Sequence, residues 1–319
     1  MGTGPFAVPM FRALVDSPHQ IVGLITRPTP PSKGREKSSP NPMQDAAIAH
    51  GVPVHAPANI NSDEGQSLLN SLAPELLVVC DYGQILSPEI LAIPALGGIN
   101  LHASLLPRYR GAAPIQWAIF NGDLETGVSV IHMTPRLDAG PILTVRQTTI
   151  GADETHPELE DRLARLGIEA VQEAIATLMS WNRTSDVGAR QDAALASKAP
   201  RLKKEQGAID WSRSARQIHD QVRAFKPWPA SFTYWLRPGH ESLRLVADQV
   251  RVIADATEAT TTKSEPGTVL ISDGKQLLIA TGEQALSLTS LQPAGKRLMP
   301  VGDFLRGYAV REGDRFGSE

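Results

Sequence analysis

The chain has 319 residues, of which 41% are hydrophobic and 20% charged, and its formal net charge is −3. A chain of this length can bury a large core, and at about 150 residues per domain it predicts two domains. The single cysteine, Cys80, excludes an internal disulfide, no Cys/His cluster has zinc spacing, and no apolar run reaches the roughly 18 residues of a membrane span. We therefore expect no metal, no membrane partner and a cytoplasmic location.

Four short apolar runs with β-branched residues lie in the first half of the chain, each bounded by turn residues. They are QIVGLIT (20–26), ELLVVC (75–80), GGINLH (97–102) and TGVSVIHM (126–133). The segments between the first three are long enough for helices, and strands that alternate with helices are typical of a largely parallel sheet. We therefore predict a Rossmann-like α/β domain over residues 1–184.

A long helix is predicted over residues 157–181, where leucines and other apolar residues fall close to helical spacing. The polar, aperiodic stretch that follows predicts a linker at residues 185–208. Residues 212–225 again have helical spacing, and short strand-like runs separated by turn signals come after them. These runs predict a small antiparallel, OB-like barrel within a C-terminal domain of residues 209–319, and open barrels of this sort often bind nucleic acid.

The two halves of the chain differ in the sign of their charge. From Arg201 onward, 17 Lys and Arg stand against 14 Asp and Glu, whereas the first 200 residues hold 14 against 20. The difference is either random scatter or the mark of a C-terminal half that tolerates a polyanion.

The third apolar run ends in two polar residues, Asn100 and His102, before a loop opens. Residues i and i+2 of a strand point to the same face, so both side chains project together at the carboxyl end of a sheet strand, where open α/β sheets place their ligands. An amide donor beside an imidazole can polarise a carbonyl group and transfer a proton. The alternative is a structural Asn/His pair satisfied inside the fold.

The segment PRLDAGPIL (135–143) places Asp138 in a tight turn after the next strand. From there its carboxylate can reach the same strand-end cavity and orient the His102 imidazole or stabilise its charge. Taken alone, an Asp before Ala-Gly is also a common turn residue.

The segments that contain Asn100, His102 and Asp138 resemble those of a known enzyme family. The stretch INLHASLLPRYRGAAPIQWAIFNGD (99–123) resembles the signature of enzymes that transfer a formyl group from 10-formyltetrahydrofolate, and LDAGPIL resembles their second catalytic segment. Asn100, His102 and Asp138 match the catalytic trio of that family. The trio implies that Asn100 and His102 donate hydrogen bonds to the oxyanion of the formyl group, and that His102, tuned by Asp138, helps to remove the proton of the attacking amine.

The resemblance extends over nearly the whole chain, through MGTGPFAVP, YGQILSPEIL, IDWS, AFKPWPASF and SLQPAGKRLMP. Together these segments are similar to the two-domain members that formylate initiator methionyl-tRNA and so support translation initiation, and the first and last segments matter most. Glycinamide ribonucleotide formyltransferases share the trio but lack the C-terminal domain. Two departures stand out: Asp81 replaces a usually small apolar residue, and Gly4-Pro5 replaces the usual Pro-acidic pair. We expect a monomer.

The resemblance also implies two binding regions. The folate co-substrate should lie along one loop and against the backbone of a second, which together contain Ser104, Leu105, Leu106, Pro107, Tyr82, Gly83, Gln84 and Ile85. The polar segment 26–42 reads by composition as a solvated loop, and in the family it contacts the acceptor end of the tRNA. The basic residues expected to contact tRNA phosphates there are Lys33, Arg35 and Lys37, with Arg35 preferred.

Three other functions compete with this interpretation. Residues 2–7 fit the G-x-G-x-x-A fingerprint of dinucleotide-binding oxidoreductases, but no strand precedes them here and Arg27 stands where an acidic residue is needed. A formyltransferase acting on an amino-sugar nucleotide shares the trio and the two-domain plan, although the basic loop and SLQPAGK argue against it. A catalytically dead tRNA-binding module is disfavoured by the intact trio.

The start of the chain gives one more expectation. Formyltransferases of this kind open with a short apolar strand that runs into the MGT loop, and this sequence begins at the loop itself. An interior first strand contributes buried side chains and paired backbone groups to a doubly wound sheet. We therefore expect Met1 to be an internal methionine of a protein that starts several residues earlier.

Overall fold

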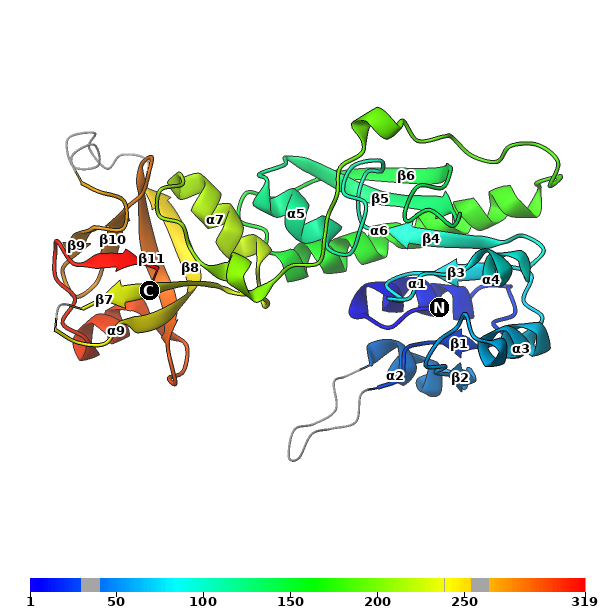
Figure 1. The fold of residues 1–319 in the computed structure, drawn as a ribbon, viewed down its shortest axis with the longest axis horizontal. Coiled ribbons are helices and arrows are strands. Elements are labelled where there is room, and N and C mark those ends of the chain that lie inside the picture. The colour runs from blue at the N-terminus through cyan, green and yellow to red at the C-terminus, as the bar shows by residue number, and fades with distance from the viewer. Residues whose placement is uncertain (30–40, 238, 254–263, 319) are drawn as a thin grey trace. The chain divides into compact units, whose positions relative to one another are not determined.

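The computed structural model describes residues 1–29, 41–237, 239–253 and 264–318 (Figure 1). The chain divides into two compact units, and each contains segments from different parts of the sequence. The first unit consists of Met1–Pro114, Glu125–Thr149 and Glu158–Pro200, and the second of Ile115–Leu124, Ile150–Pro157 and Arg201–Glu319.

Parallel strand pairs form the first part of unit 1. Strand β1 (Leu24–Ile25) pairs with β2 (Val54–His55), and β3 (Leu77–Val79) pairs with β4 (Gly98–His102). The first predicted strand is shorter than its apolar run, because only two of its residues find partners on β2. The pairing confirms the predicted Rossmann-like, parallel-sheet region.

The first residues of the chain connect these two pairs. The backbone N–H of Gly2 donates to the carbonyl of Ile25 at 3.1 Å, and that of Thr3 donates to the carbonyl of Asp81 at 3.0 Å. Residues 1–3 therefore run between β1 and the end of β3.

Two antiparallel strands extend the sheet beyond β4. Strand β5 (Glu125–His132) pairs with β4, and β6 (Ile142–Thr149) pairs with β5, which gives the order β3-β4-β5-β6. The run predicted at 126–133 is thus a strand of the same sheet, running opposite to β4. In this register His102 lies beside Ser129.

Helix α6 (His156–Met179) packs along one face of this sheet. A side chain at Gly167 would come within 2.6 Å of the Leu101 side chain, and Thr144 Oγ1 donates to the carbonyl of Ala170 at 2.9 Å. Leu101 therefore points toward α6. Its neighbours Asn100 and His102 point to the opposite face, because side chains alternate along a strand.

Several of the remaining helices of unit 1 begin at side-chain caps. The side chains of Asn41, Ser62 and Ser87 accept hydrogen bonds from backbone N–H groups of the first turn, which are otherwise unpaired at a helix start. The remaining short helices are η1 (Pro5–Ala7), α1 (Val8–Val15), α2 (Pro42–Ala49), α3 (Asp63–Leu72), α4 (Pro88–Ala92) and η2 (Ala193–Leu195).

Unit 2 is built on an antiparallel barrel, as predicted. Its sheet has the order β13-β7-β8-β11-β10-β9, with β12 paired to β11. The ends of the sheet meet, because Phe316 N donates to the carbonyl of Gly267 and Val269 N to that of Asp314, both at 2.8 Å. The strands are β7 (Ser231–Leu236), β8 (Leu243–Ile253), β9 (Val269–Ser272), β10 (Leu277–Ala280), β11 (Ala285–Pro293), β12 (Met299–Pro300) and β13 (Arg315–Gly317).

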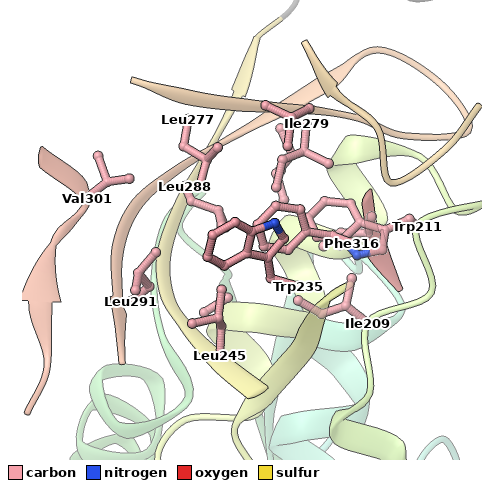
Figure 2. Close-up of a cluster of buried hydrophobic side chains, with 14 of the residues drawn as sticks. Ile209, Trp211, Trp235, Leu245, Leu277, Ile279, Leu288, Leu291, Val301 and Phe316 are labelled. Carbon is pink, nitrogen blue, oxygen red and sulfur yellow. The ribbon is translucent and has the colours of Figure 1, made fainter. Parts of the chain in front are cut away.

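The barrel interior holds an apolar core (Figure 2), to which the strands contribute alternate residues. Trp211 and Trp235 lie within it, and each indole N–H has a partner: Nε1 of Trp211 donates to Thr233 Oγ1 at 2.9 Å, and Nε1 of Trp235 to the Asp314 carboxylate at 3.1 Å. Helix α9 (Val301–Gly307) adds Phe304, which is fully buried. A buried indole keeps its stabilising effect when its polar edge is paired in this way.

Helix α7 (Ala215–Ala224) lies within the predicted helix 212–225 and begins at a capping box formed by Ser214 and Gln217. Its far end binds two segments that come from earlier in the sequence. Arg223 donates to the carbonyls of Gly151 and Glu154 at 3.2 and 3.0 Å, and the Phe225 ring stacks on Phe120 with centroids 5.1 Å apart. These contacts explain why parts of helix α5 (Pro114–Phe120) and of residues 150–157 belong to unit 2.

The stretch predicted as a linker has definite contacts. Residues 185–200 pack within unit 1, and the 3₁₀-helix η3 (Lys204–Gly207) lies in unit 2. In the described parts of the chain, no helix combines the length and apolarity needed to cross a membrane.

Candidate active site

Asn100, His102 and Asp138 meet at the carboxyl end of β4, as the sequence predicted. Nδ2 of Asn100 lies 3.5 Å from Oδ1 of Asp138, and Nδ1 of His102 lies 3.8 Å from Oδ2 of the same carboxylate. His102 is 6% exposed, and the Asp138 side chain is 10% exposed. Because so little water reaches these side chains, the interaction between the carboxylate and the imidazole is weakly screened.

The tautomer of His102 follows from its second partner. Nε2 lies 2.9 Å from the backbone carbonyl of Tyr109. A carbonyl only accepts hydrogen bonds, so Nε2 carries the proton and the neutral ring has its lone pair on Nδ1. Nδ1 is therefore the nitrogen that accepts a proton, and it faces Asp138.

Asp138 is held by the loop that also supplies the Tyr109 carbonyl. The backbone N–H of Gly111 donates to Oδ2 of Asp138 at 2.9 Å. Only glycine fits at position 111, because φ is +127° and an added Cβ would lie 2.6 Å from the carbonyl oxygen of Ala199. Asp138 itself has φ of +48°, a conformation that tertiary contacts must maintain.

The loop after β4 contains the first group of predicted folate residues. Ser104 is fully buried, and its Oγ donates to the carbonyl of Arg108 at 2.7 Å. Ser129 on β5 binds the backbone of this loop: its Oγ donates to the carbonyl of Ser104 at 2.7 Å and accepts from the N–H of Leu106 at 3.0 Å. Leu106 is buried and Leu105 and Pro107 are half-buried.

The loop after β3 contains the second group and lies at the same edge of the sheet, because β3 and β4 are parallel neighbours. Gln84 Oε1 accepts from the N–H of Ile60 at 3.0 Å, and the carbonyl of Ile85 accepts from Asn61 at 2.9 Å. Ile85 itself is 65% exposed, and Gly83 has φ of +79°. The loop is thus anchored to residues 60 and 61, and the side chain of Ile85 faces solvent.

Tyr82 has a different setting from the rest of this loop. Its ring is buried in the apolar cluster beneath the loop, and its hydroxyl has no hydrogen-bond partner among the described residues. Burial raises the pKa of Tyr82 to about 12, against a smaller lowering effect of Arg27. Its side chain therefore stays neutral and serves the packing of the loop.

The two departures from the family pattern lie in contact with each other. A side chain at Gly4 would come within 1.6 Å of Oδ2 of Asp81, so the Asp81 carboxylate occupies the space beside the Gly4 backbone. The charge of Asp81, after the larger effect of burial, raises the pKa of the Glu160 carboxyl on α6 to about 7. Adding a side chain at Gly4 while Asp81 is kept therefore produces a clash, and shortening Asp81 while Gly4 is kept leaves a gap.

Sequence reasoning missed the groups that hold the trio in place. The Tyr109 carbonyl and the Gly111 N–H are backbone groups, and the residue type does not predict such a role for them. Gln191 contacts the backbone of Asp138, but it lies in the stretch that sequence predicted as a linker. The basic residues Lys33, Arg35 and Lys37 lie outside the described residues.

Two family models match this chain: one described as Formyl transferase covers residues 1–175, and one described as Formyl transferase, C-terminal domain, covers residues 201–309. Fold and site together define a two-domain formyl transferase of the folate-dependent class. The chain belongs to the formyl transferase family.

Curated relatives match along the whole chain. The sequence is 48% identical to a methionyl-tRNA formyltransferase of Rhodopirellula baltica, over 99% of this chain and 95% of the relative. It is 42% identical to a methionyl-tRNA formyltransferase of Pelobacter propionicus, with the same two coverages. Among solved structures, an N-formyltransferase from Helicobacter canadensis in complex with folinic acid and dTDP-3-aminofucose matches with a TM-score of 0.62 and 15% identity, over 90% of this chain and 96% of that one. This last match shows a shared fold.

Proposed function

We propose that this chain transfers the formyl group of 10-formyltetrahydrofolate to the amino group of methionine on initiator methionyl-tRNA and so supports translation initiation. The observation that carries the proposal is the convergence of Asn100, His102 and Asp138 at one strand end, in a chain 48% identical over nearly its full length to a methionyl-tRNA formyltransferase. The amino-sugar nucleotide transferases among the solved structures share the fold at far lower identity.

His102 acts as the proton acceptor in this proposal. Its Nε2–H bond to the Tyr109 carbonyl leaves Nδ1 with the lone pair, so Nδ1 takes a proton from the attacking methionine amine. The imidazolium that results is stabilised by the Asp138 carboxylate, whose Oδ2 lies 3.8 Å away. The same proton can then be donated to the leaving nitrogen of the folate, which completes the exchange without a covalent enzyme adduct.

Asn100 stabilises the negative charge that develops on the formyl oxygen. Its Nδ2 lies at the long limit of hydrogen bonding to Asp138, at 3.5 Å, so the amide can turn toward an oxyanion at little cost. One such donor typically contributes about 3 kcal/mol to the transition state. This division of roles differs from the sequence expectation that both Asn100 and His102 donate to the oxyanion, because Nε2 of His102 is already paired.

Folate binding is assigned to the loops after β3 and β4. The first loop offers an exposed apolar side chain at Ile85, which suits a planar aromatic ring, and the Arg27 side chain lies beside its Gly83. The second, from Ser104 to Pro107, is rigidly tied to β5 and borders the trio in sequence. A formyl donor held between them supplies the carbonyl carbon that the amine attacks.

For tRNA binding, the proposal assigns phosphate contacts to Lys33, Arg35 and Lys37, as the resemblance implies. The reaction needs one copy of the chain, since the trio comes from a single chain, and the enzyme is proposed to act as a monomer in the cytoplasm. Mixing the full chain with 10-formyltetrahydrofolate and either methionyl-tRNA or an amino-sugar nucleotide tests the function. Formyl transfer to the tRNA alone is expected, and transfer to the sugar alone would refute the proposal.

A further inference from the structure

The segment 189–199 is hydrogen-bonded to both loops that hold the trio. At its start, Ala189 exchanges two backbone hydrogen bonds of 2.8 Å with Ile142, just beyond the Asp138 turn. Near its end, Ser197 and Ala199 pair with the backbone of Arg110 at 2.8 and 2.7 Å. The segment thus connects the turn of Asp138 with the loop that contains Tyr109 and Gly111, and all of these residues lie in unit 1.

One side chain in this segment makes contacts with both loops at once. Nε2 of Gln191 donates to the carbonyls of Asp138 and Gly140, both at 2.8 Å, and its Oε1 accepts from Nε and Nη2 of Arg110 at 3.1 and 2.6 Å. Carbonyls only accept and a guanidinium only donates, so the orientation of the amide is unambiguous. All four hydrogen-bonding positions of the Gln191 amide are used.

The partners of Gln191 are the immediate neighbours of the groups that orient the trio. Arg110 lies between Tyr109, whose carbonyl pairs with His102, and Gly111, whose N–H pairs with Asp138. The Asp138 carbonyl that Gln191 binds belongs to a residue with φ of +48°, which needs such support.

We propose that Gln191 and Arg110 form a positioning pair for formyl transfer, which keeps the Asp138 carboxylate in register with Nδ1 of His102. Neither residue is assigned to contact the reacting atoms. The expected effect on kcat rests on the proposed function. The expected effect on the loops that hold Asp138 and Gly111 rests only on the geometry of unit 1.

The kinetic test uses the full chain carrying Gln191→Glu or Gln191→Leu. Gln191→Glu keeps the acceptor for Arg110 but replaces two donors with a carboxylate that faces two carbonyls. We expect kcat to fall about tenfold or more, while KM for both substrates changes less than about threefold and the unfolding transition shows a folded protein. Arg190→Gln, an exposed neighbour on the same segment, is the control and should leave kcat unchanged.

A double-mutant cycle shows whether the two side chains act together. In Arg110→Ala combined with Gln191→Ala, the loss of kcat should equal that of the more impaired single variant, because residues that act as a unit are not additive. The proposal would be overturned if the fold-loss of kcat in the double variant equalled the product of the two single losses. It would also be overturned if folded Gln191 variants kept kcat within about twofold of wild type.

A second readout does not depend on activity. Amide hydrogen exchange at single residues should become about tenfold faster at Gly111 in Gln191→Leu, and remain unchanged at Leu106, whose N–H is held by Ser129. Unchanged exchange at Gly111 would overturn the inference. A further outcome is that wild type forms no formyl-methionyl-tRNA while amide exchange at Gly111 still becomes faster in Gln191→Leu. In that case the proposed function fails, and the structural role of Gln191 and Arg110 in holding the loop of Gly111 stands.

Discussion

The backbone carbonyl of Tyr109 lies 2.9 Å from Nε2 of His102 and thereby determines which nitrogen of the ring can accept a proton. Tyr109 has φ of +60°, so the carbonyl is directed at the ring by an unusual backbone conformation. The side of His102 that faces Asp138 is the reactive side. The chemistry of the site therefore depends on the loop 108–111 as much as on the three side chains.

Gly111→Ala is expected to disturb this loop. The added Cβ would approach the Ala199 carbonyl to 2.6 Å at a residue with φ of +127°. We expect a loss of about 1 to 3 kcal/mol in the free energy of unfolding and a lower kcat, because the Gly111 N–H moves away from Asp138. Denaturant unfolding and initial rates measure the two effects.

Gly51→Ala is the matched control. Gly51 also has positive φ, at +67°, but nothing lies within 4 Å of an added Cβ. It should lose stability without losing kcat. Equal kcat losses in both variants would show that backbone strain, and not the position of Gly111, is responsible.

Glu160 predicts a pH dependence of stability. Burial first, and the Asp81 charge second, raise its pKa from 4.5 to about 7. The folded state then holds a proton that the unfolded state has lost between these values, so the free energy of unfolding falls as pH rises from about 4.5 to about 7 and levels off above. Because the side chain is partly exposed, we expect about 1 to 2 kcal/mol in total.

Glu160→Gln removes this dependence. The variant should match wild type near pH 4.5 and be more stable at pH 8, as measured by denaturant unfolding at both values. Glu169→Gln, at an exposed position of the same helix, should follow the wild-type curve. A Glu160→Gln variant that is less stable than wild type at pH 8 would contradict the effect assigned to burial.

The basic residues of the 26–42 segment should act on tRNA and not on folate. Neutralising Arg35 and Lys37 to Gln is expected to flatten the slope of log K against log salt for tRNA binding by about 1 to 2, because fewer counterions are released. Folate affinity should stay unchanged, and Arg165→Gln, an exposed Arg on α6, should change neither. Equal losses in tRNA and folate binding would place the segment at the folate site instead.

The sequence could predict the parts of the site that depend on periodicity. Asn100 and His102 are two residues apart at a strand end, and the runs of apolar residues located β3, β4 and β5 to within a few residues. It could not predict the Tyr109 carbonyl, since the left-handed conformation at a tyrosine has no signal in residue type. Gln191 escaped notice because segment 189–199 gains its structure from hydrogen bonds to distant loops and has no periodicity of its own.

The most direct measurement is single-turnover formation of formyl-methionyl-tRNA by wild type and by Asn100→Ala, His102→Ala and Asp138→Asn, each shown to be folded and saturated with both substrates. We expect that wild type converts the tRNA and that each variant does so about a hundredfold or more slowly, because each lacks a preorganised donor, base or counter-charge. Asp138→Asn can keep an oxygen for the Gly111 N–H, but it removes the charge beside His102 and replaces the oxygen that accepts from Asn100, so its loss reports on both. A rate near that of wild type in folded His102→Ala would contradict the account.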